Sequence, residues 1–315
     1  MRPKSYLPGH LVIRKASRKK AKLRLGIAAP GGAGKTMGSL FLAYGITKDW
    51  DKIGLIDTEE GSGELYAGTH KNGVTIGDYQ YCGISAPYTV AKYIDAIKAM
   101  EQVCDVVIID SLSHAWAGTG GLLDKQGKIA DASKNSYTAW RFVTPEHTAL
   151  VDSLLQSPRH IIATMRSKQE YVLEAGSNGK MAPRKVGMAP IQRDGMEYEF
   201  TVMFDINQDA IATATKDRTD LFSSTDGAGR IEKRQFVISP KIGEELAEWL
   251  NKGEESLDML CEKMVADIKI STDLEAAFQK HAALIQRVKD EKPEWAGHIT
   301  HLFEVRNQEL SAVPT

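Results

Sequence analysis

The sequence predicts an α/β protein: a mainly parallel sheet with helices on both faces, followed by a small C-terminal helical domain. Three observations predict this class. Apolar runs typical of buried strands alternate with segments of helical periodicity up to about residue 250. A glycine-rich run joins the first strand to the first helix. Residues 253–315 show the spacing of about three amphipathic helices and no strand signal.

The first strand and helix flank a loop suited to phosphate. Residues 22–29 read as a strand and residues 37–46 as a helix. Residues 29–36, Ala-Pro-Gly-Gly-Ala-Gly-Lys-Thr, fit the P-loop pattern, with Ala29 where the first glycine usually stands. Backbone N–H groups of such a loop curve around phosphate oxygens at a helix N-terminus, along a path that glycine permits. We therefore expect a nucleotide to contact Pro30, Gly31, Gly32, Ala33, Gly34, Lys35, Thr36 and Met37.

The later elements continue the alternation. Thr144 suits the N-cap of a helix and Pro145 suits the first helical position, so a helix is expected to start there. Two strands of more antiparallel character come after the parallel ones. The expected elements are a strand at 52–57, a helix at 87–104, a strand at 105–110, a helix at 144–156, a strand at 159–164, strands at 197–207 and 209–215, and a helix at 240–250.

Charged and polar side chains at strand ends complete a nucleotide site. Lys35 would contact the β- and γ-phosphates, and the Thr36 hydroxyl would bind Mg²⁺. Asp110 follows four hydrophobic residues at the end of the third strand and would reach the same ion through water. Glu59 follows the second strand and could orient or deprotonate the attacking water, with Glu60 as the fallback; a solvated acidic loop is the competing interpretation. The sequence lacks the Asn-Lys-X-Asp motif with which GTPases recognise guanine, so ATP is the expected nucleotide.

Composition and charge indicate the class of protein and its cellular location. The chain has 315 residues, of which 42% are hydrophobic and 26% charged, which is ordinary for a globular protein. No apolar run reaches the length of a membrane span, and three scattered cysteines fit a reducing cytoplasm, so we expect a cytoplasmic protein with no membrane partner. Residues 1–24 hold nine Lys or Arg, and no acid precedes Asp49. We expect a basic arm at 1–21, which either binds DNA or is a solvated tail, an ATPase core at 22–252 and a helical domain at 253–315.

The order of these motifs resembles the RecA-type ATPase core. The resemblance rests on the P-loop, on Ile-Asp-Thr-Glu at the end of the second strand and on Ile-Ile-Asp-Ser at the end of the third. The resemblance implies that Glu59 is the catalytic glutamate. It places Thr164 where RecA carries a glutamine that senses the nucleotide. It also implies that Lys216 and Arg218 reach the γ-phosphate of a neighbouring subunit; two exposed cations on a loop are the competing interpretation.

Over residues 22–250 the chain is more closely similar to phage-encoded, RecA-like single-strand annealing ATPases. The segments 191–200 and 216–222 carry this likeness. It implies ATP hydrolysis at the interfaces of a ring or filament of identical subunits, single-stranded DNA as a partner, and a function in DNA recombination. A phage single-strand binding protein is a further candidate partner, and the host cytoplasm is the expected location.

Two segments are the expected DNA loops in that family. Residues 113–137 contain Trp116, Lys125, Lys128 and Lys134, and residues 166–195 contain Tyr171 with an excess of cations. Cations would follow the phosphates while Tyr171 or Trp116 stacks on a base; a solvated loop with nothing bound is the alternative. The candidate DNA-binding residues of the second segment are Arg166, Lys168, Lys180, Arg184, Lys185 and Arg193.

Two other functions stay open at this point. The chain could be an ATP-dependent remodelling or loading factor of AAA type whose partner is a protein such as a replicative helicase. It could also be a nucleotide-gated switch with little turnover. Stimulation of the ATPase by DNA would favour the annealing function, and stimulation by a protein partner alone would favour the loading factor.

Overall fold

The computed structural model describes residues 15–175, 181–225 and 230–311. They divide into two compact units. Residues 22–250 form the larger unit, and residues 15–21 group with the chain from Asn251 onward. The first described residues of the basic arm thus belong to the same unit as the C-terminal helices.

A mostly parallel sheet forms the centre of the larger unit, which confirms the expected fold class. Neighbouring strands pair in parallel from β5 to β9, whereas β10 and β13 are antiparallel. Although β7 comes after β2, β5 and β6 in the sequence, it lies between β1 and β6 in the sheet. Across the sheet the strands are β13 (Gln235–Val237), β10 (Ile211–Asp217), β9 (Val202–Ile206), β1 (Arg24–Ala29), β7 (His160–Ala175), β6 (Val106–Asp110), β2 (Ile53–Asp57) and β5 (Gln80–Gly83).

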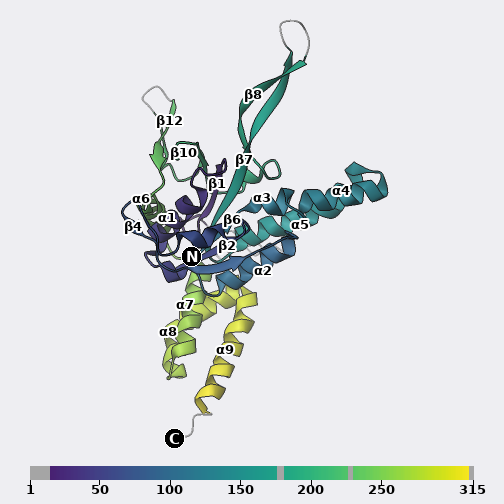
Figure 1. Ribbon diagram of the computed structural model, residues 1–315. Coiled ribbons are helices and arrows are strands. Elements are labelled where there is room, and N and C mark those ends of the chain that lie inside the picture. The colour runs from purple at the N-terminus through teal and green to yellow at the C-terminus, as the bar shows by residue number, and fades with distance from the viewer. Residues whose placement is uncertain (1–14, 176–180, 226–229, 312–315) are drawn as a thin grey trace. The chain divides into compact units, whose positions relative to one another are not determined.

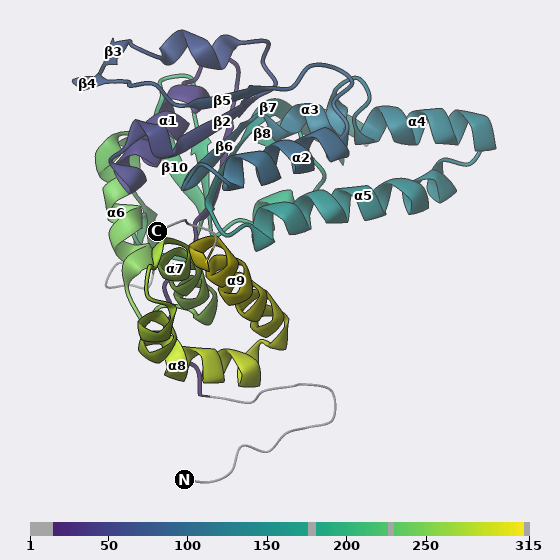
Figure 2. The ribbon, with the colours of Figure 1, turned by 90° about the horizontal axis from the view of Figure 1, so that it is seen from below.

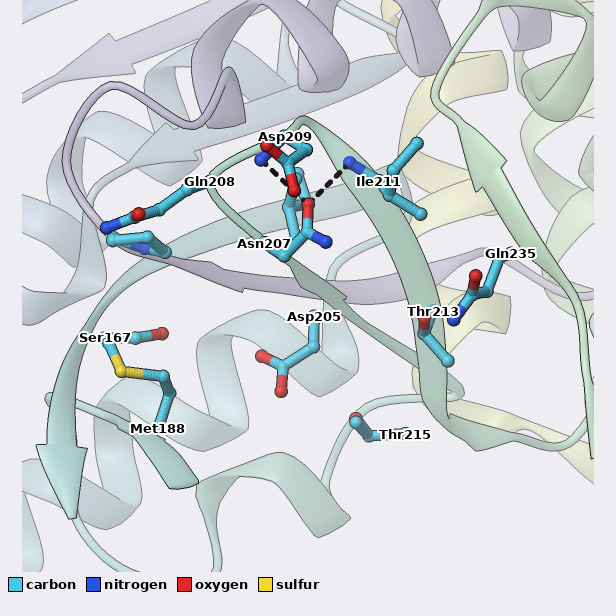
Figure 3. Close-up of a pocket in the computed structure, with 12 residues that line it drawn as sticks. Ser167, Met188, Asp205, Asn207, Gln208, Asp209, Ile211, Thr213, Thr215 and Gln235 are labelled. Carbon is cyan, nitrogen blue, oxygen red and sulfur yellow. Dashed lines mark hydrogen bonds between the residues drawn. The ribbon is translucent and has the colours of Figure 1, made fainter. Parts of the chain in front are cut away.

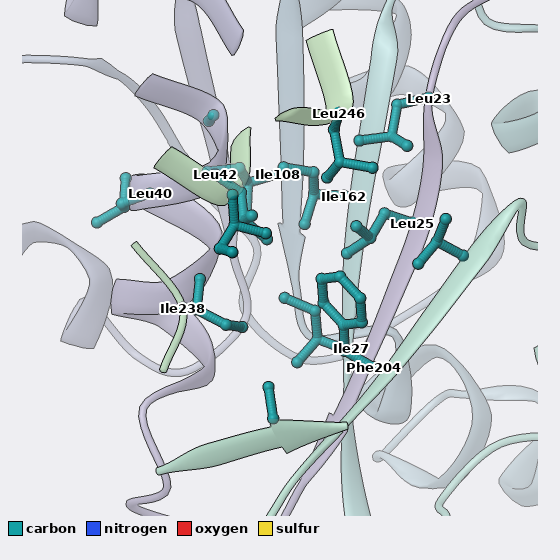
Figure 4. Close-up of a cluster of buried hydrophobic side chains, with 14 of the residues drawn as sticks. Leu23, Leu25, Ile27, Leu40, Leu42, Ile108, Ile162, Phe204, Ile238 and Leu246 are labelled. Atoms are coloured by element: carbon teal, nitrogen blue, oxygen red, sulfur yellow. The ribbon is translucent and has the colours of Figure 1, made fainter. Parts of the chain in front are cut away.

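Helices cover both faces of this sheet. Alternate residues of β1 point to one face, where Leu25 and Ile27 pack with Leu40 of α1 (Lys35–Thr47) and Leu246 of α6 (Pro240–Asn251) (Figure 4). The opposite face packs on α2 (Val90–Glu101), α3 (Leu112–Ala117) and α5 (Ser136–Gln156). Each fully buried leucine contributes about 1.5–3 kcal/mol through burial. Both faces are therefore closed by apolar packing, as near-continuous apolar strands require.

Helix α5 begins eight residues before the predicted start at Thr144. The side chain of Asn135 accepts a hydrogen bond from Thr138 N at 3.0 Å, which caps the helix there. Pro145 consequently lies inside the helix. The pair Thr144-Pro145 has the same local chemistry as a true N-terminus, and this is why the prediction was wrong.

In their described residues, both segments expected to be DNA loops consist largely of helices and strands. Residues 113–137 include most of α3 and all of α4 (Leu122–Ser133), which runs alongside α5 away from the sheet (Figures 1 and 2). Residues 166–195 hold the end of β7 and the strand β8 (Met181–Pro190), which pair from Ser167 with Pro190 to Ala175 with Met181. The resulting hairpin extends from the sheet (Figure 1). The residues of β7 and β8 that form the hairpin do not alternate regularly between apolar and polar, so the sequence did not reveal this strand pairing.

Smaller elements complete the larger unit. The strand expected at 197–207 begins only at Val202, because residues 196–198 form a 3₁₀ turn. The remaining elements are η1 (Trp50–Lys52), η2 (Ser62–Tyr66), β3 (His70–Lys71), β4 (Val74–Thr75), η3 (Met196–Tyr198), β11 (Ser223–Thr225) and β12 (Ile231–Lys233).

The smaller unit contains the three helices expected from the sequence. They are α7 (Leu257–Ile270), α8 (Leu274–Glu291) and α9 (Pro293–Ser311), with Met264 and Val288 in their apolar core. The described arm joins this unit through Lys20 N, which donates to Glu254 O at 2.8 Å. Lys19 pairs with Glu254, and Lys20 pairs with Glu255 at 3.2 Å. These two lysines are therefore partly neutralised. In the described ranges, no helix has both the length and the apolarity to cross a membrane.

Candidate nucleotide site

The loop between β1 and α1 has the backbone of a phosphate cradle. Gly32 and Gly34 have φ angles of +78° and +91°, a region that side chains disfavour. A Cβ atom added at Gly31, Gly32 or Gly34 would meet no other atom within 4 Å. Gly34 caps α1 without a side-chain hydrogen bond. The concave side of the loop is therefore open, and the first N–H groups of α1 are directed to it.

Lys35 lies against its own loop. Its ammonium donates to the carbonyl oxygens of Ala29 at 3.3 Å and Pro30 at 3.0 Å, and the residue is buried. Burial lowers the pKa of Lys35, and the nearby charges of Asp110 and Glu59 oppose that shift. The carbonyl acceptors carry no net charge, so an anionic phosphate oxygen would be a stronger partner for the ammonium.

Asp110 is held by two hydroxyl groups, one from the start of helix α1 and one from the neighbouring strand β7. Thr36 Oγ1 donates to one carboxylate oxygen, and Thr164 Oγ1 donates to the other at 2.5 Å. Burial raises the pKa of Asp110, and the two hydroxyl bonds partly offset this. Because β7 lies between β1 and β6, the ends of all three strands meet here. The position expected to sense the nucleotide, Thr164, thus binds Asp110.

The donor set of Thr36 and Asp110 fits Mg²⁺, which prefers a hydroxyl, a carboxylate and phosphate oxygens. Within the described ranges, no group of three or more His, Cys, Asp or Glu could hold a metal ion. The ion would therefore depend on the oxygens of a bound nucleotide as well as on Thr36 and Asp110.

Glu59 faces this site from the end of β2. Its backbone N–H donates to Asp57 Oδ1 at 2.6 Å, while Thr58 N donates to Asp110 O at 2.7 Å and ties the turn to β6. Ser111 Oγ donates to Glu59 Oε1 at 3.1 Å. The fallback residue, Glu60, has a φ angle of +55° and is exposed. Of the two glutamates, Glu59 is the one that the turn directs to Asp110 and Ser111.

Arg166 makes an ion pair with Glu59 that sequence reasoning missed. Its Nε atom donates to Glu59 Oε1 at 2.9 Å, and its Nη2 atom donates to Oε2. Burial alone would raise the pKa of Glu59, but the hydrogen bonds and charge of Arg166 outweigh burial, so the pKa lies below its usual value. The same hydrogen bond raises the pKa of Arg166. The carboxylate is thus ionised and occupied.

Residues 21–231 match a family model described as an AAA domain (AAA_24). The chain belongs to the AAA domain family. The match spans the P-loop, Glu59, Asp110 and Thr164, and membership indicates a P-loop ATPase. No curated protein resembles the chain closely enough to register as a match.

A cavity of the AAA domain that Lys168 of β7 helps to line combines tryptophans with cations. It has a volume of about 460 Å³ and is lined by Trp116, Trp140, Lys168, Gln192, Arg193 and Asp194. The two tryptophan rings stack with centroids 5.9 Å apart and planes 22° apart. Trp140 escaped sequence reasoning because α5 was predicted to begin after it. The structure thus brings Trp116, Lys168 and Arg193 together from three separate segments.

The other DNA candidates are dispersed. Arg184 and Lys185 lie on β8, Tyr171 lies on β7, and Lys180 falls outside the described residues. On α4, Lys125 pairs with Glu146, and Lys128 pairs with Asp124 at 2.9 Å. Lys134 is the C-cap of that helix.

Lys216 and Arg218 lie two strands away from β1, level with the first half of that strand and not with its P-loop end. Lys216 pairs in register with Met203, which pairs with Gly26 of β1, and Arg218 N donates to Thr201 O at 3.2 Å. The Lys216 ammonium donates to Tyr198 O, and burial, followed by the charge of Arg218, lowers its pKa. Neither cation is therefore placed to serve the P-loop of its own chain.

A second cavity, of about 650 Å³, has Pro30 of the P-loop in its wall (Figure 3). Asp205 projects between Ser167 and Met188 on one side and Thr215 on the other (Figure 3). Burial raises the pKa of Asp205. Among the described residues that line this cavity, the charged ones are Asp205 and Asp209, so it is unsuited to phosphate.

Proposed function

We propose that this AAA domain protein is an ATP-dependent recombinase or annealing protein that binds single-stranded DNA in DNA recombination. The observation that supports this most is the arrangement along β7. Thr164 binds Asp110, Arg166 binds Glu59, and Lys168 lines the tryptophan cavity. Five residues of one strand therefore connect the nucleotide site with a surface suited to nucleic acid.

The chemistry assigned to the site follows from its side chains. The loop N–H groups and Lys35 would hold the triphosphate of ATP, and Thr36 with Asp110 would hold Mg²⁺. When bound, Mg²⁺ neutralises charge on the phosphate oxygens. Glu59 would accept a hydrogen bond from water and orient it for attack on the γ-phosphate. Its ionised carboxylate suits that role.

The tryptophan cavity is proposed to bind single strands without reading sequence. Each base stacked on an aromatic ring contributes about 1–3 kcal/mol, and every base has a face that can stack. Lys168 and Arg193 would pair with the backbone phosphates beside it. Buried Gln192 fixes the floor through a hydrogen bond from its amide to Leu112 O at 3.1 Å.

Hydrolysis is proposed to occur between subunits of a homo-oligomer. Lys216 and Arg218 lie away from their own P-loop, so a contribution to catalysis requires a head-to-tail neighbour. A cation supplied in this way stabilises charge in the transition state and raises the rate by about 10³–10⁵ in other ATPases and GTPases. The likeness to phage annealing ATPases supports this part of the proposal.

Binding of labelled oligo-dT, measured by fluorescence anisotropy with an ATP analogue, tests the DNA function. Contacts to about six phosphates would give a log–log salt slope near −4. Trp140→Ala should weaken binding by about 1–3 kcal/mol, whereas Trp140→Phe, which keeps an aromatic face, should lose much less. Absence of binding, or a slope near zero, would remove DNA as the ligand.

A protein partner is the second candidate, as for a helicase-loading factor. Helices α4 and α5 carry exposed apolar side chains, among them Tyr137 at 85% and Phe142 at 63% exposure. Apolar side chains exposed together often mark protein contacts. ATPase activity that responds to a replicative helicase and ignores DNA would favour this function. Electron microscopy with an ATP analogue, with and without DNA, would distinguish rings, filaments and single subunits.

A further inference from the structure

Arg166 occupies the carboxylate that the proposed chemistry needs. Glu59 Oε1 accepts hydrogen bonds from Ser111 and Arg166, and Oε2 accepts another from Arg166. A carboxylate offers about four acceptor positions, so three are filled. A water bound at the remaining position would also lie beside a carboxylate whose negative charge is already paired. These three hydrogen bonds therefore restrain the carboxylate of Glu59.

The backbone of Arg166 is fixed where the β7–β8 hairpin leaves the sheet. Its N–H donates to Ser113 Oγ at 2.8 Å, its carbonyl accepts from Ile191 N at 2.6 Å, and strand pairing with β8 begins at the next residue. The side chain is 44% exposed, whereas that of Glu59 is 19% exposed. A ligand at the root of the hairpin can therefore reach the guanidinium from solvent.

We propose that Arg166 is a positioning residue that restrains Glu59 until a nucleic-acid phosphate at the root of the hairpin takes its guanidinium. This inference rests on the proposed function, and it concerns the regulation of the same site. It assigns Arg166 to both partners in turn: the carboxylate when DNA is absent, and a phosphate when DNA is bound.

The choice of phosphate follows from the chemistry of the side chain and its neighbours. A guanidinium binds phosphate with the same two-pronged geometry that it uses for carboxylate. Lys168 lies two residues further along β7, so the two residues share one face of the strand, and Lys168 lines the tryptophan cavity. A strand held in that cavity brings phosphates toward Arg166. Glu59 then keeps the Ser111 bond and gains free acceptor positions for water.

The test compares steady-state ATP turnover with and without oligo-dT at saturating ATP. In Arg166→Ala, turnover without DNA should rise about two- to fivefold, because ion pairs of this exposure bias an equilibrium by roughly that factor. The KM for ATP should stay within about twofold, and the stimulation by DNA should fall toward one. Arg166→Lys, which keeps one charged contact, should lie between wild type and Arg166→Ala.

Arg234→Ala is the matched control. Arg234 pairs with Glu245 at 2.6 and 3.4 Å, and the two side chains are 41% and 25% exposed, close to the values of the Arg166 pair. Its loss should leave turnover and stimulation as in wild type. Adding Glu59→Gln to Arg166→Ala should abolish the gain. Thermal melting checks that each variant is folded, and Arg166→Gln serves if the alanine variant is not.

The outcomes separate the two claims. Lower turnover in Arg166→Ala with and without DNA would mean that the guanidinium serves the bound triphosphate, and it would overturn the inference. Unchanged turnover without DNA would overturn it too, while a wild type that DNA stimulates would leave the proposed function standing. A wild type that hydrolyses ATP but ignores DNA would refute the DNA function itself. In that case a gain in Arg166→Ala would still support restraint of Glu59 but would exclude DNA as the releasing ligand.

Discussion

Replacing Thr164 by valine should destabilise the ATPase unit because it leaves a buried carboxylate oxygen without its hydrogen bond. Thr164 is fully buried, Asp110 is 2% exposed, and the hydroxyl lies 2.5 Å from Asp110 Oδ1. Valine has nearly the same shape, so the change removes the donor and little packing. A hydrogen bond to a charged group contributes about 1.5–3 kcal/mol, and an orphaned buried acceptor costs a similar amount.

The melting temperature translates this loss into an observable. For a unit of this size, 1 kcal/mol shifts Tm by about 2–4 °C, so the valine variant should melt about 3–12 °C lower. Thr164→Ser is the control, since it keeps the hydroxyl and loses one buried methyl group worth about 1 kcal/mol. Calorimetry and urea unfolding of wild type, Thr164→Val and Thr164→Ser give the comparison.

Comparing the stabilities of the two variants tests whether the Thr164 hydroxyl supports Asp110. Serine should be the milder change, and ATP hydrolysis by the valine variant should need more Mg²⁺ for half-saturation because Asp110 is less well held. A valine variant as stable as wild type, or more stable than the serine variant, would refute the argument that this hydroxyl supports Asp110.

Three further predictions test other parts of the account. Burial lowers the pKa of His160 from 6.5 to about 3. Between these two values the unfolded chain binds a proton at this histidine and the folded chain does not. The contribution of His160 to the free energy of unfolding should therefore be constant above pH 6.5 and fall by up to about 1.4 kcal/mol per pH unit below it. Urea titrations at pH 7.5 and 5.0 should show a smaller fall for His160→Asn, and an equal fall would contradict the assignment. Arg218→Ala should lose turnover yet bind ATP, and mixing it with Lys35→Ala should partly restore activity; intact mixed oligomers without rescue would exclude a contribution in trans. Gly34→Ala should weaken ATP binding by at least about 1 kcal/mol in calorimetric titrations, since φ is +91° there, and unchanged affinity would argue against the cradle.

Local chemistry made the fold class and the nucleotide loop predictable. The glycines, Lys35 and Thr36 must be contiguous to wrap a phosphate, and Asp110 must end a buried strand, so each signal is readable within a few residues. Strand and helix alternation then implies a parallel sheet whose carboxyl ends share an edge.

Contacts between distant segments were not predictable from the same signals. The Arg166–Glu59 pair joins residues 107 positions apart, and Arg166 looks like any cation in a glycine-rich stretch. The hairpin pairing of β7 with β8 has no apolar alternation, and Trp140 was hidden by the misplaced start of α5. In each case the deciding partner comes from another element, and a local pattern carries no information about it.

The central claim is that Glu59 serves hydrolysis of a triphosphate held by the P-loop and Asp110. Measuring ATP affinity and turnover of Glu59→Gln on the same protein tests it most directly. The account predicts a Kd for ATP within about threefold of wild type and a turnover at least about 100-fold lower, in keeping with the 10²–10⁴-fold that a positioned base contributes. Turnover close to wild type with ATP bound normally would contradict it.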